Sequence, residues 1–180
     1  RKNMADKKKE NAVVVSQEQL AEGIFSLWLQ TEAAKDAKPG QFISMYTNDG
    51  SKLLPRPISI CEIDKENGCL RMVYRVTGEN TGTKQFSECK PGDTVPVIGP
   101  LGNGFPLEEA VGKRVFLMGG GIGIPPMLEL AKNIEGAVSK DIIVGYRNRE
   151  LFLSQDLEKY GNVHIATEDG SVGTQGNVMN

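Results

Sequence analysis

The sequence predicts two domains: a six-stranded antiparallel β-barrel, followed by an α/β domain with a parallel sheet that looks truncated. Short alternating segments fill the first half, separated by turn sequences such as Lys38-Pro39-Gly40 and Pro91-Gly92-Asp93. Strands at this spacing, divided by Gly and Pro, are typical of a small barrel. After Val111-Gly112 the pattern changes to a continuous apolar run, Arg114 to Met118, which suits a strand buried on both faces of a parallel sheet.

Six strands and one short helix make up the predicted barrel. Phe25, Leu27 and Leu29 alternate along the second strand, as expected where one face is buried. Asn67-Gly68 is a hairpin signal between the fourth and fifth strands. The helix is expected from about Thr83 to Glu88. The strands are Val13 to Val15, Ile24 to Leu29, Gln41 to Tyr46, Arg56 to Ile60, Leu70 to Val76 and Thr94 to Ile98.

The second domain is predicted as a βαβαβ unit that ends after three strands. Pro125 and Pro126 suit the first turn of a helix, where no hydrogen-bond donor is lost. Ser154 is expected to cap the next helix. The strands are Arg114 to Met118, Asp141 to Tyr146 and Val163 to Ala166, and the helices are Met127 to Ile134 and Ser154 to Tyr160.

The domain bounds follow from these patterns. Residues 1–10 are expected to form a disordered basic tail, because charged residues dominate them. Met4 is a candidate for the natural first residue. The barrel is expected over residues 11–110, and the incomplete α/β domain over residues 111–180.

Composition narrows the class of protein. A hydrophobic content of 39% and a charged content of 24% are typical of a globular protein, and no apolar run approaches a membrane span. The net charge of -2 gives no reason to expect nucleic acid. Cys61, Cys69 and Cys89 have no C-x-x-C spacing, so we expect reduced thiols in a cytoplasmic protein and no metal site.

The stretch Arg56-Pro57-Ile58-Ser59 is the first candidate for a binding site. A guanidinium held beside a rigid strand start suits bidentate capture of a phosphate or pyrophosphate. Ser59 can offer a hydroxyl to whatever is attached to that phosphate. Taken alone, the stretch is more simply explained as an edge strand that Pro57 opens beside a surface arginine.

Two glycine-containing loops add further candidates. The loop Gly78 to Thr83 precedes the short helix, whose free N–H groups and positive dipole end favour an anion. A plain turn into a helix explains this loop equally well. Gly119 to Gly123 lie at a strand–helix junction, where parallel sheets bind nucleotides, although the spacing is not the G-x-G-x-x-G fingerprint.

Together these motifs resemble the ferredoxin-reductase-like flavoproteins, which join an FAD-binding barrel to a nicotinamide-nucleotide domain. The order Arg56 to Ser59, Gly99 to Phe105 and Gly119 to Pro126 carries this resemblance. Pro39 to Phe42 and Ala166 to Thr174 narrow it to the electron-transfer subunits of B-type dihydroorotate dehydrogenases. The resemblance covers nearly all of the chain after the tail.

The resemblance implies a set of FAD-binding positions. Arg56 is expected to bind the pyrophosphate, and Ser59 to lie near the reactive edge of the flavin. Val73 to Arg75 are expected to line the flavin and its ribityl chain, and the helix start at Gly82 and Thr83 to contact the pyrophosphate. The complete set is Arg56, Pro57, Ile58, Ser59, Val73, Tyr74, Arg75, Gly82 and Thr83.

For NAD(H), the resemblance implies a cradle made by the loop residues Gly119, Gly120, Gly121 and Gly123. No catalytic side chain is implied, because hydride transfer requires two rings held in contact rather than an acid or base. NADH is expected in preference to NADPH. Arg147 and Arg149 follow the second strand, however, where a cation could hold a 2′-phosphate.

The implied function is transfer of electrons between NAD(H) and an FMN-containing catalytic subunit of dihydroorotate dehydrogenase, in pyrimidine biosynthesis. A small subunit of a related NAD(P)H:acceptor oxidoreductase, such as a ferredoxin-linked transhydrogenase or sulfide dehydrogenase, is a second hypothesis. A flavin-binding module without turnover is a third. Family members continue into a cysteine-rich tail that holds a [2Fe-2S] cluster, and the three cysteines here match none of those ligands.

Overall fold

The computed structural model describes residues 9–49 and 54–179. The chain forms two compact units, Arg1–Gly104 and Phe105–Asn180, which are described separately below. Of the tail expected over residues 1–10, residues 1–8 lie outside the described ranges. Glu10 already belongs to the first strand.

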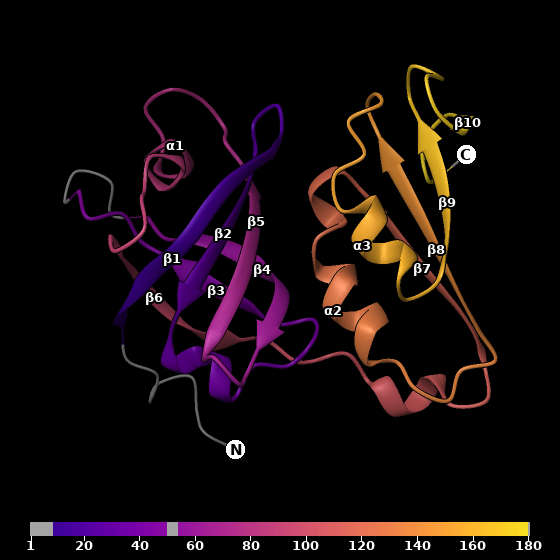
Figure 1. Cartoon of the computed structure of the whole chain (residues 1–180), viewed down its shortest axis with the longest axis horizontal. Coiled ribbons are helices and arrows are strands. Elements are labelled where there is room, and N and C mark those ends of the chain that lie inside the picture. Colours follow the sequence, from indigo (N-terminus) through magenta and orange to yellow (C-terminus); the bar gives the residue numbers. More distant parts are fainter. Residues whose placement is uncertain (1–8, 50–53, 180) are drawn as a thin grey trace. The chain divides into compact units, whose positions relative to one another are not determined.

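Unit 1 is a closed antiparallel barrel with the strand order β1-β2-β5-β4-β3-β6 (Figure 1). The prediction of a six-stranded barrel is therefore confirmed. The helical segments of this unit are η2 (Glu32–Lys35) and α1 (Gly82–Ser87). The strands are β1 (Glu10–Ala21), β2 (Ile24–Gln30), β3 (Phe42–Met45), β4 (Arg56–Asp64), β5 (Cys69–Arg75) and β6 (Thr94–Leu101).

The barrel core follows from the alternation of apolar residues along the strands. Leu27 and Leu29 on β2 point into the core together with Ile58 and Ile60 on β4. Burying side chains of this size contributes about 1.5–3 kcal/mol each. The core therefore fixes which residues of β4 and β5 face outward.

Unit 2 contains a parallel sheet with the order β10-β9-β8-β7. Its strands are β7 (Arg114–Gly120), β8 (Ser139–Tyr146), β9 (Asn162–Thr167) and β10 (Thr174–Gln175). Its helical segments are η3 (Leu107–Ala110), η4 (Gly121–Gly123), α2 (Pro126–Asn133) and α3 (Ser154–Glu158). The two α-helices lie side by side on one face of the sheet (Figure 1).

Three details of this unit differ from the prediction. The strand at Arg114 is not buried on both faces, because Phe116 and Met118 are 58% and 51% exposed on this edge strand. The sheet does not end after three strands, since β10 pairs with β9 in parallel. Ser154 is the first residue of α3 rather than its cap, and the cap position is taken by Leu153 in a left-handed conformation.

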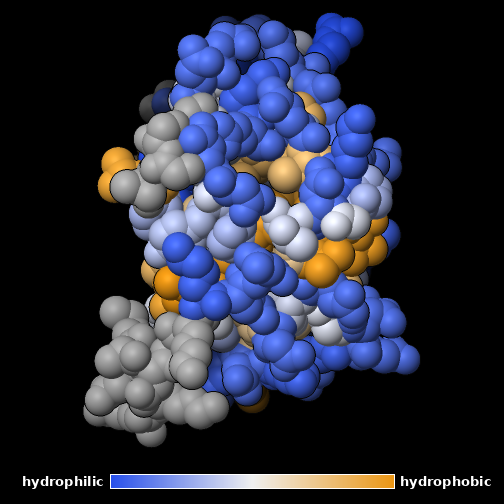
Figure 2. All heavy atoms as spheres, turned by 90° about the vertical axis from the view of Figure 1, so that its left-hand side faces the viewer, coloured by the Kyte–Doolittle hydropathy of each residue, from blue (hydrophilic) through white to orange (hydrophobic). Residues whose placement is uncertain are grey.

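Figure 2 shows a face that is mainly hydrophilic, with smaller apolar areas. Within the described ranges, no helix combines the length and apolar character that crossing a membrane requires.

Candidate functional site

Arg56 lies at the start of α1, although the two are distant in the sequence. It is half-buried as the first residue of β4 and pairs with Met45. A Cβ atom added at Gly82, the first residue of α1, would be 3.6 Å from Arg56 Nε and 3.7 Å from Arg56 Cγ. The same atom would be 3.3 Å from Thr47 Cγ2. The arginine side chain and the helix start therefore border one small space.

The first turn of α1 contains N–H groups that form no hydrogen bond within the helix itself. The cap residue Thr81 accepts a hydrogen bond from the Lys84 N–H through its hydroxyl, at 3.3 Å. This leaves the N–H groups of Gly82 and Thr83 without a partner inside the helix. The Thr83 hydroxyl accepts a hydrogen bond from the Thr77 N–H at 3.0 Å and is hydrogen-bonded to the Thr81 hydroxyl at 3.1 Å. These bonds stabilise the loop that precedes α1. The backbone of Thr83, rather than its side chain, is therefore available to a ligand.

These groups form a site suited to an anion with several oxygen atoms. A guanidinium offers a fork of donors, and the free N–H groups at a helix start add further donors together with a partial positive charge. The structure thus brings together Arg56 and the Gly82–Thr83 helix start, two candidates that the resemblance assigns to the same pyrophosphate. Thr47 is an additional neighbour that sequence reasoning missed.

Along β4 the side chains next to Arg56 alternate in direction. Ile58 is buried in the barrel core, whereas Pro57 and Ser59 are exposed on the outer face. Any ligand contact of Ile58 is therefore made by its backbone. The exposed Ser59 lies on the same strand as the half-buried Arg56, three residues further along.

The three predicted positions on β5 also differ in direction. Val73 pairs with Ser26 and is buried, at 2% exposure, although it is not part of the core cluster that contains Tyr74. Arg75 is half-buried at the end of the strand. Tyr74 points inward and belongs to the core. Its hydroxyl donates to Gln17 Oε1 at 2.6 Å, and burial raises the pKa of Tyr74, which keeps the phenol protonated. The Tyr74 side chain is thus engaged within the barrel.

In unit 2, the four loop glycines are not equivalent. Gly119 is buried, and an added Cβ atom would be 2.9 Å from the Gly123 carbonyl oxygen and 3.1 Å from Met127 Sδ. This glycine is required for packing. Gly120 and Gly123 are exposed, and Gly121 has φ +54°, a conformation that glycine adopts without strain. The exposed backbone from Gly120 to Gly123 is the part that can contact a ligand.

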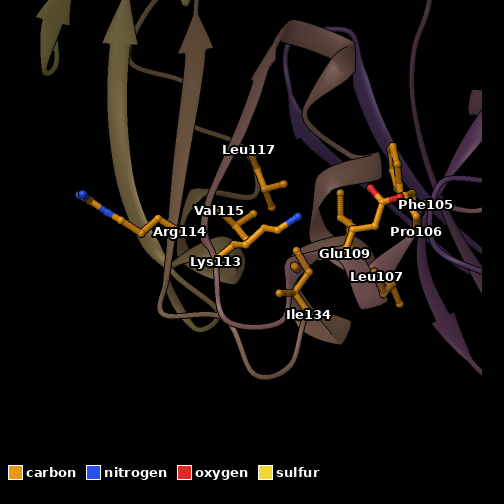
Figure 3. A pocket seen from close by; sticks show the side chains of 11 residues that line it. Phe105, Pro106, Leu107, Glu109, Lys113, Arg114, Val115, Leu117 and Ile134 are labelled. Carbon is orange, nitrogen blue, oxygen red and sulfur yellow. The ribbon is translucent and has the colours of Figure 1, made fainter.

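A pocket of about 270 Å³ lies elsewhere in unit 2. Its walls come from η3, the first half of β7 and α2, and include Leu117 and Leu130. Figure 3 shows the Lys113 side chain extending into this pocket and the Arg114 side chain extending away from it. The pocket does not include the glycine loop, so it is not part of the candidate site.

The described residues contain no cluster of three His, Cys, Asp or Glu side chains able to hold a metal ion. The three cysteines form no disulfide, and Cys61 and Cys69 are buried while Cys89 is half-buried. Burial raises the pKa of the Cys69 and Cys89 thiols, which disfavours the thiolate that metals require. These cysteines do not fit an iron–sulfur cluster.

Comparisons with known proteins agree with this geometry and confirm the predicted resemblance. The electron transfer subunit of dihydroorotate dehydrogenase B (NAD(+)) from Enterococcus faecalis is 43% identical over 176 residues, which cover 96% of this chain and 66% of that protein. The subunit of the same name from Streptococcus pneumoniae is 44% identical over 168 residues, covering 92% of this chain and 66% of that protein. The chain therefore spans just under two thirds of the length of these relatives.

Among solved structures, an NADH-dependent reduced ferredoxin-NADP oxidoreductase, studied for flavin-based electron bifurcation, superimposes with a TM-score of 0.81. The two chains are 28% identical, and the match covers 93% of this chain and 60% of that one. The family model described as the oxidoreductase FAD-binding domain matches residues 11–105, the barrel that carries Arg56 and α1. Its match to more than half of the chain shows that this protein belongs to the family of oxidoreductase FAD-binding domains.

Proposed function

We propose that this chain is the FAD-binding and NAD(H)-binding part of an electron-transfer subunit of a B-type dihydroorotate dehydrogenase. The observation that carries the proposal is the position of Arg56 beside the first-turn N–H groups of α1, on a barrel of the FAD-binding family. The names of the most similar relatives supply the finer assignment.

The residues at this position fit FAD. Gly82 leaves open the space that any larger side chain would fill, so a phosphate group can approach both Arg56 and the helix start. Ser59 is exposed on β4, where the flavin ring can extend from the phosphates, and Val73 is a buried residue of the neighbouring strand β5. When bound, FAD supplies the capacity to accept a hydride and to release electrons one at a time.

For the nicotinamide nucleotide, we infer that the backbone from Gly120 to Gly123 holds the phosphates at the carboxyl end of β7. Gly120, Gly121 and Gly123 carry no side chain, which permits close approach of a phosphate to the backbone, while the Ile122 side chain is 45% exposed beside them. Orientation of the two rings is the protein's contribution to the reaction, and no acidic or basic side chain is required.

We further infer that the electron partner is an FMN-containing catalytic subunit that oxidises dihydroorotate to orotate in pyrimidine biosynthesis. This assignment rests on the names of the relatives, which are electron transfer subunits. The [2Fe-2S] cluster of the longer family members finds no ligands among the cysteines present, and no step is assigned to it. The three cysteines, which form no disulfide, support a reducing, cytoplasmic location.

An absorbance experiment tests the proposed function. The purified chain, incubated with FAD and passed through a desalting column, is expected to retain flavin absorbance at substoichiometric iron. Anaerobic NADH is then expected to bleach the flavin. A colourless eluate would refute the proposal, and about two irons per chain would show that the cysteines bind a cluster after all.

Replacing Arg56 by alanine is expected to weaken FAD binding by about 2 kcal/mol, roughly 30-fold, because a bidentate charge-assisted contact is lost. Arg56→Lys keeps the charge but not the fork and is expected to recover only part of the affinity. Fluorescence titration measures both. Arg114→Ala, an exposed arginine of β7, serves as the control and is expected to bind FAD like the parent.

The flavin is expected to be reduced faster by NADH than by NADPH. Arg147 and Arg149 are exposed after β8, and no described contact orients either one toward a 2′-phosphate. Stopped-flow reduction with each nucleotide measures the preference. Faster reduction by NADPH, abolished in Arg147→Ala, would reverse this assignment.

A second candidate is the small subunit of a related NAD(P)H:acceptor oxidoreductase. The similarity to the NADH-dependent ferredoxin-NADP oxidoreductase at a TM-score of 0.81 favours it. Co-purification distinguishes the two candidates: a partner that oxidises dihydroorotate supports the first, and a partner that reduces ferredoxin or sulfur compounds supports the second. Bound FAD that NADH does not bleach would instead indicate a flavin-binding module without turnover.

A further inference from the structure

We propose that Gln17 and Tyr74 are positioning residues that hold α1 in place, so that its first turn faces Arg56. The inference rests on the proposed binding of FAD at that turn. It gives the Tyr74 side chain a role behind the site, in addition to the flavin-lining position that the resemblance implies for Val73 to Arg75.

Gln17 connects three elements of the barrel through its side-chain amide. The Nε2 group donates to the carbonyl oxygens of Phe86 and Cys89, at 2.9 and 3.0 Å. These carbonyls belong to the last turn of α1 and the residues directly after it. Gln17 Oε1 accepts the hydroxyl hydrogen of Tyr74 on β5 at 2.6 Å. Gln17 itself lies on β1, about 70 residues away from the helix it holds.

The direction of each hydrogen bond is determined by its partners. Backbone carbonyls only accept, so the amide nitrogen of Gln17 must face Phe86 and Cys89, and both of its hydrogens are used. The amide oxygen must then face Tyr74, whose hydroxyl can only donate to it. A carboxylate at position 17 could not replace this arrangement, because it has no donors.

The same tyrosine also anchors α1 through apolar contacts. Phe86, a buried residue of α1, packs edge-on against the Tyr74 ring, with centroids 6.2 Å apart at an angle of 90°. On its other side, Tyr74 stacks with Phe25 at 6.1 Å and 21°. The carboxyl end of α1 is thus held to the barrel by a polar and an aromatic contact that meet at Tyr74.

The position of this end matters because α1 is short. A helix of six residues is about 9 Å long and is not stable alone, so its tertiary contacts decide where it lies. A rigid segment fastened at one end transmits any shift to the other. At that other end, a Cβ atom added at Gly82 would be 3.6 Å from Arg56 Nε. Loosening the Gln17–Tyr74 contact should therefore move the N–H donors away from the arginine.

The test compares FAD affinity with folding stability. Gln17→Leu and Tyr74→Phe each remove the Gln17–Tyr74 hydrogen bond, and both are expected to weaken FAD binding about tenfold under conditions where the apoprotein is fully folded. The double variant is expected to bind no more weakly than the worse single variant, because the two residues act as one unit. Amide hydrogen exchange in α1 is expected to accelerate in each variant.

Ile63→Val is the matched control, because it removes one methyl group from a buried side chain near the end of β4 that is distant from Arg56. It should lower stability without changing FAD affinity. If the variants and the parent bind FAD equally, Gln17 and Tyr74 are only structural and the inference is wrong. If the parent protein does not bind FAD, the proposed function is wrong, and the inference, which depends on that function, is wrong as well. Should Gln17→Leu not fold, Tyr74→Phe, which removes a single oxygen atom, decides the question.

Discussion

Gly173→Ala is expected to lower the free energy of unfolding of unit 2 by at least about 3 kcal/mol. Two penalties act together at this position. The residue has φ +63°, a left-handed conformation that costs an ordinary residue about 1–2 kcal/mol. An added Cβ atom would also overlap the carbonyl oxygen of Ile165 on β9, and a backbone atom cannot rotate away.

Gly112→Ala separates these two penalties. Gly112 lies in the same unit with φ +71°, and an added Cβ atom would meet nothing within 4 Å. It is therefore expected to lose only about 1–2 kcal/mol. Denaturant unfolding of both variants measures the difference. Equal losses would show that the loop before β10 relaxes to accommodate the extra atom.

The reason for this sensitivity is the tight loop that Gly173 ends. The Thr167 hydroxyl donates to the Val172 carbonyl at 2.7 Å and accepts from the Val172 N–H at 3.2 Å. This exchange closes the loop and brings Thr174 next to Ala166 in parallel register. The fourth strand of the sheet thus depends on a glycine, and the sequence alone gave no sign of that strand because it is only two residues long.

The barrel was predictable because its apolar residues alternate with the strand period. The prediction was incomplete where the extent of a strand is determined by its pairing with a neighbouring strand rather than by alternating apolar residues. The first strand was expected only at Val13 to Val15, yet β1 continues to Ala21. Its second half is polar, but it pairs with β2 through Ala21 and Ile24. Backbone hydrogen bonds between strands do not require apolar side chains, so the hydrophobic pattern of the sequence does not indicate them.

The burial of β7 could not be predicted for a related reason. A continuous apolar run indicates a strand covered on both faces only when helices lie on both sides of the sheet. In this chain α2 and α3 share one face, which leaves Phe116 and Met118 exposed. Sequence pattern identifies a strand, but the elements that cover it are decided by the topology.

In the candidate site, too, some features were predictable from the sequence and others are determined only by the fold. Arg56 and the loop before α1 were each identifiable from their chemistry, but their proximity arises only when the barrel closes. The inward direction of Tyr74 had a signal, since Leu70 and Met72 place it on the apolar face of β5 by alternation. No sequence signal indicated the role of Gln17, because it is a single polar residue within a polar stretch.

Filling the space between α1 and Arg56 should have the largest effect on function. Gly82→Val is expected to weaken FAD binding at least about 100-fold, because the side chain would occupy the place where a phosphate contacts the helix start. An added Cβ atom already lies 3.3 Å from Thr47 Cγ2 and 3.6 Å from Arg56 Nε, and valine adds two methyl groups beyond it.

The fold should tolerate the change. Gly82 is not among the glycines with positive φ, and valine in a helix costs less than about 1 kcal/mol. Near-UV circular dichroism of the apoprotein checks that the barrel is intact. Gly82→Ala is the graded control: its single methyl group makes one tight contact, 3.3 Å from Thr47 Cγ2, which a small shift of that side chain relieves, so less than a tenfold loss is expected. If Gly82→Val titrates with FAD like the parent while Arg56→Ala does not, the phosphate lies on the arginine but away from α1. The helix start would then have no part in binding.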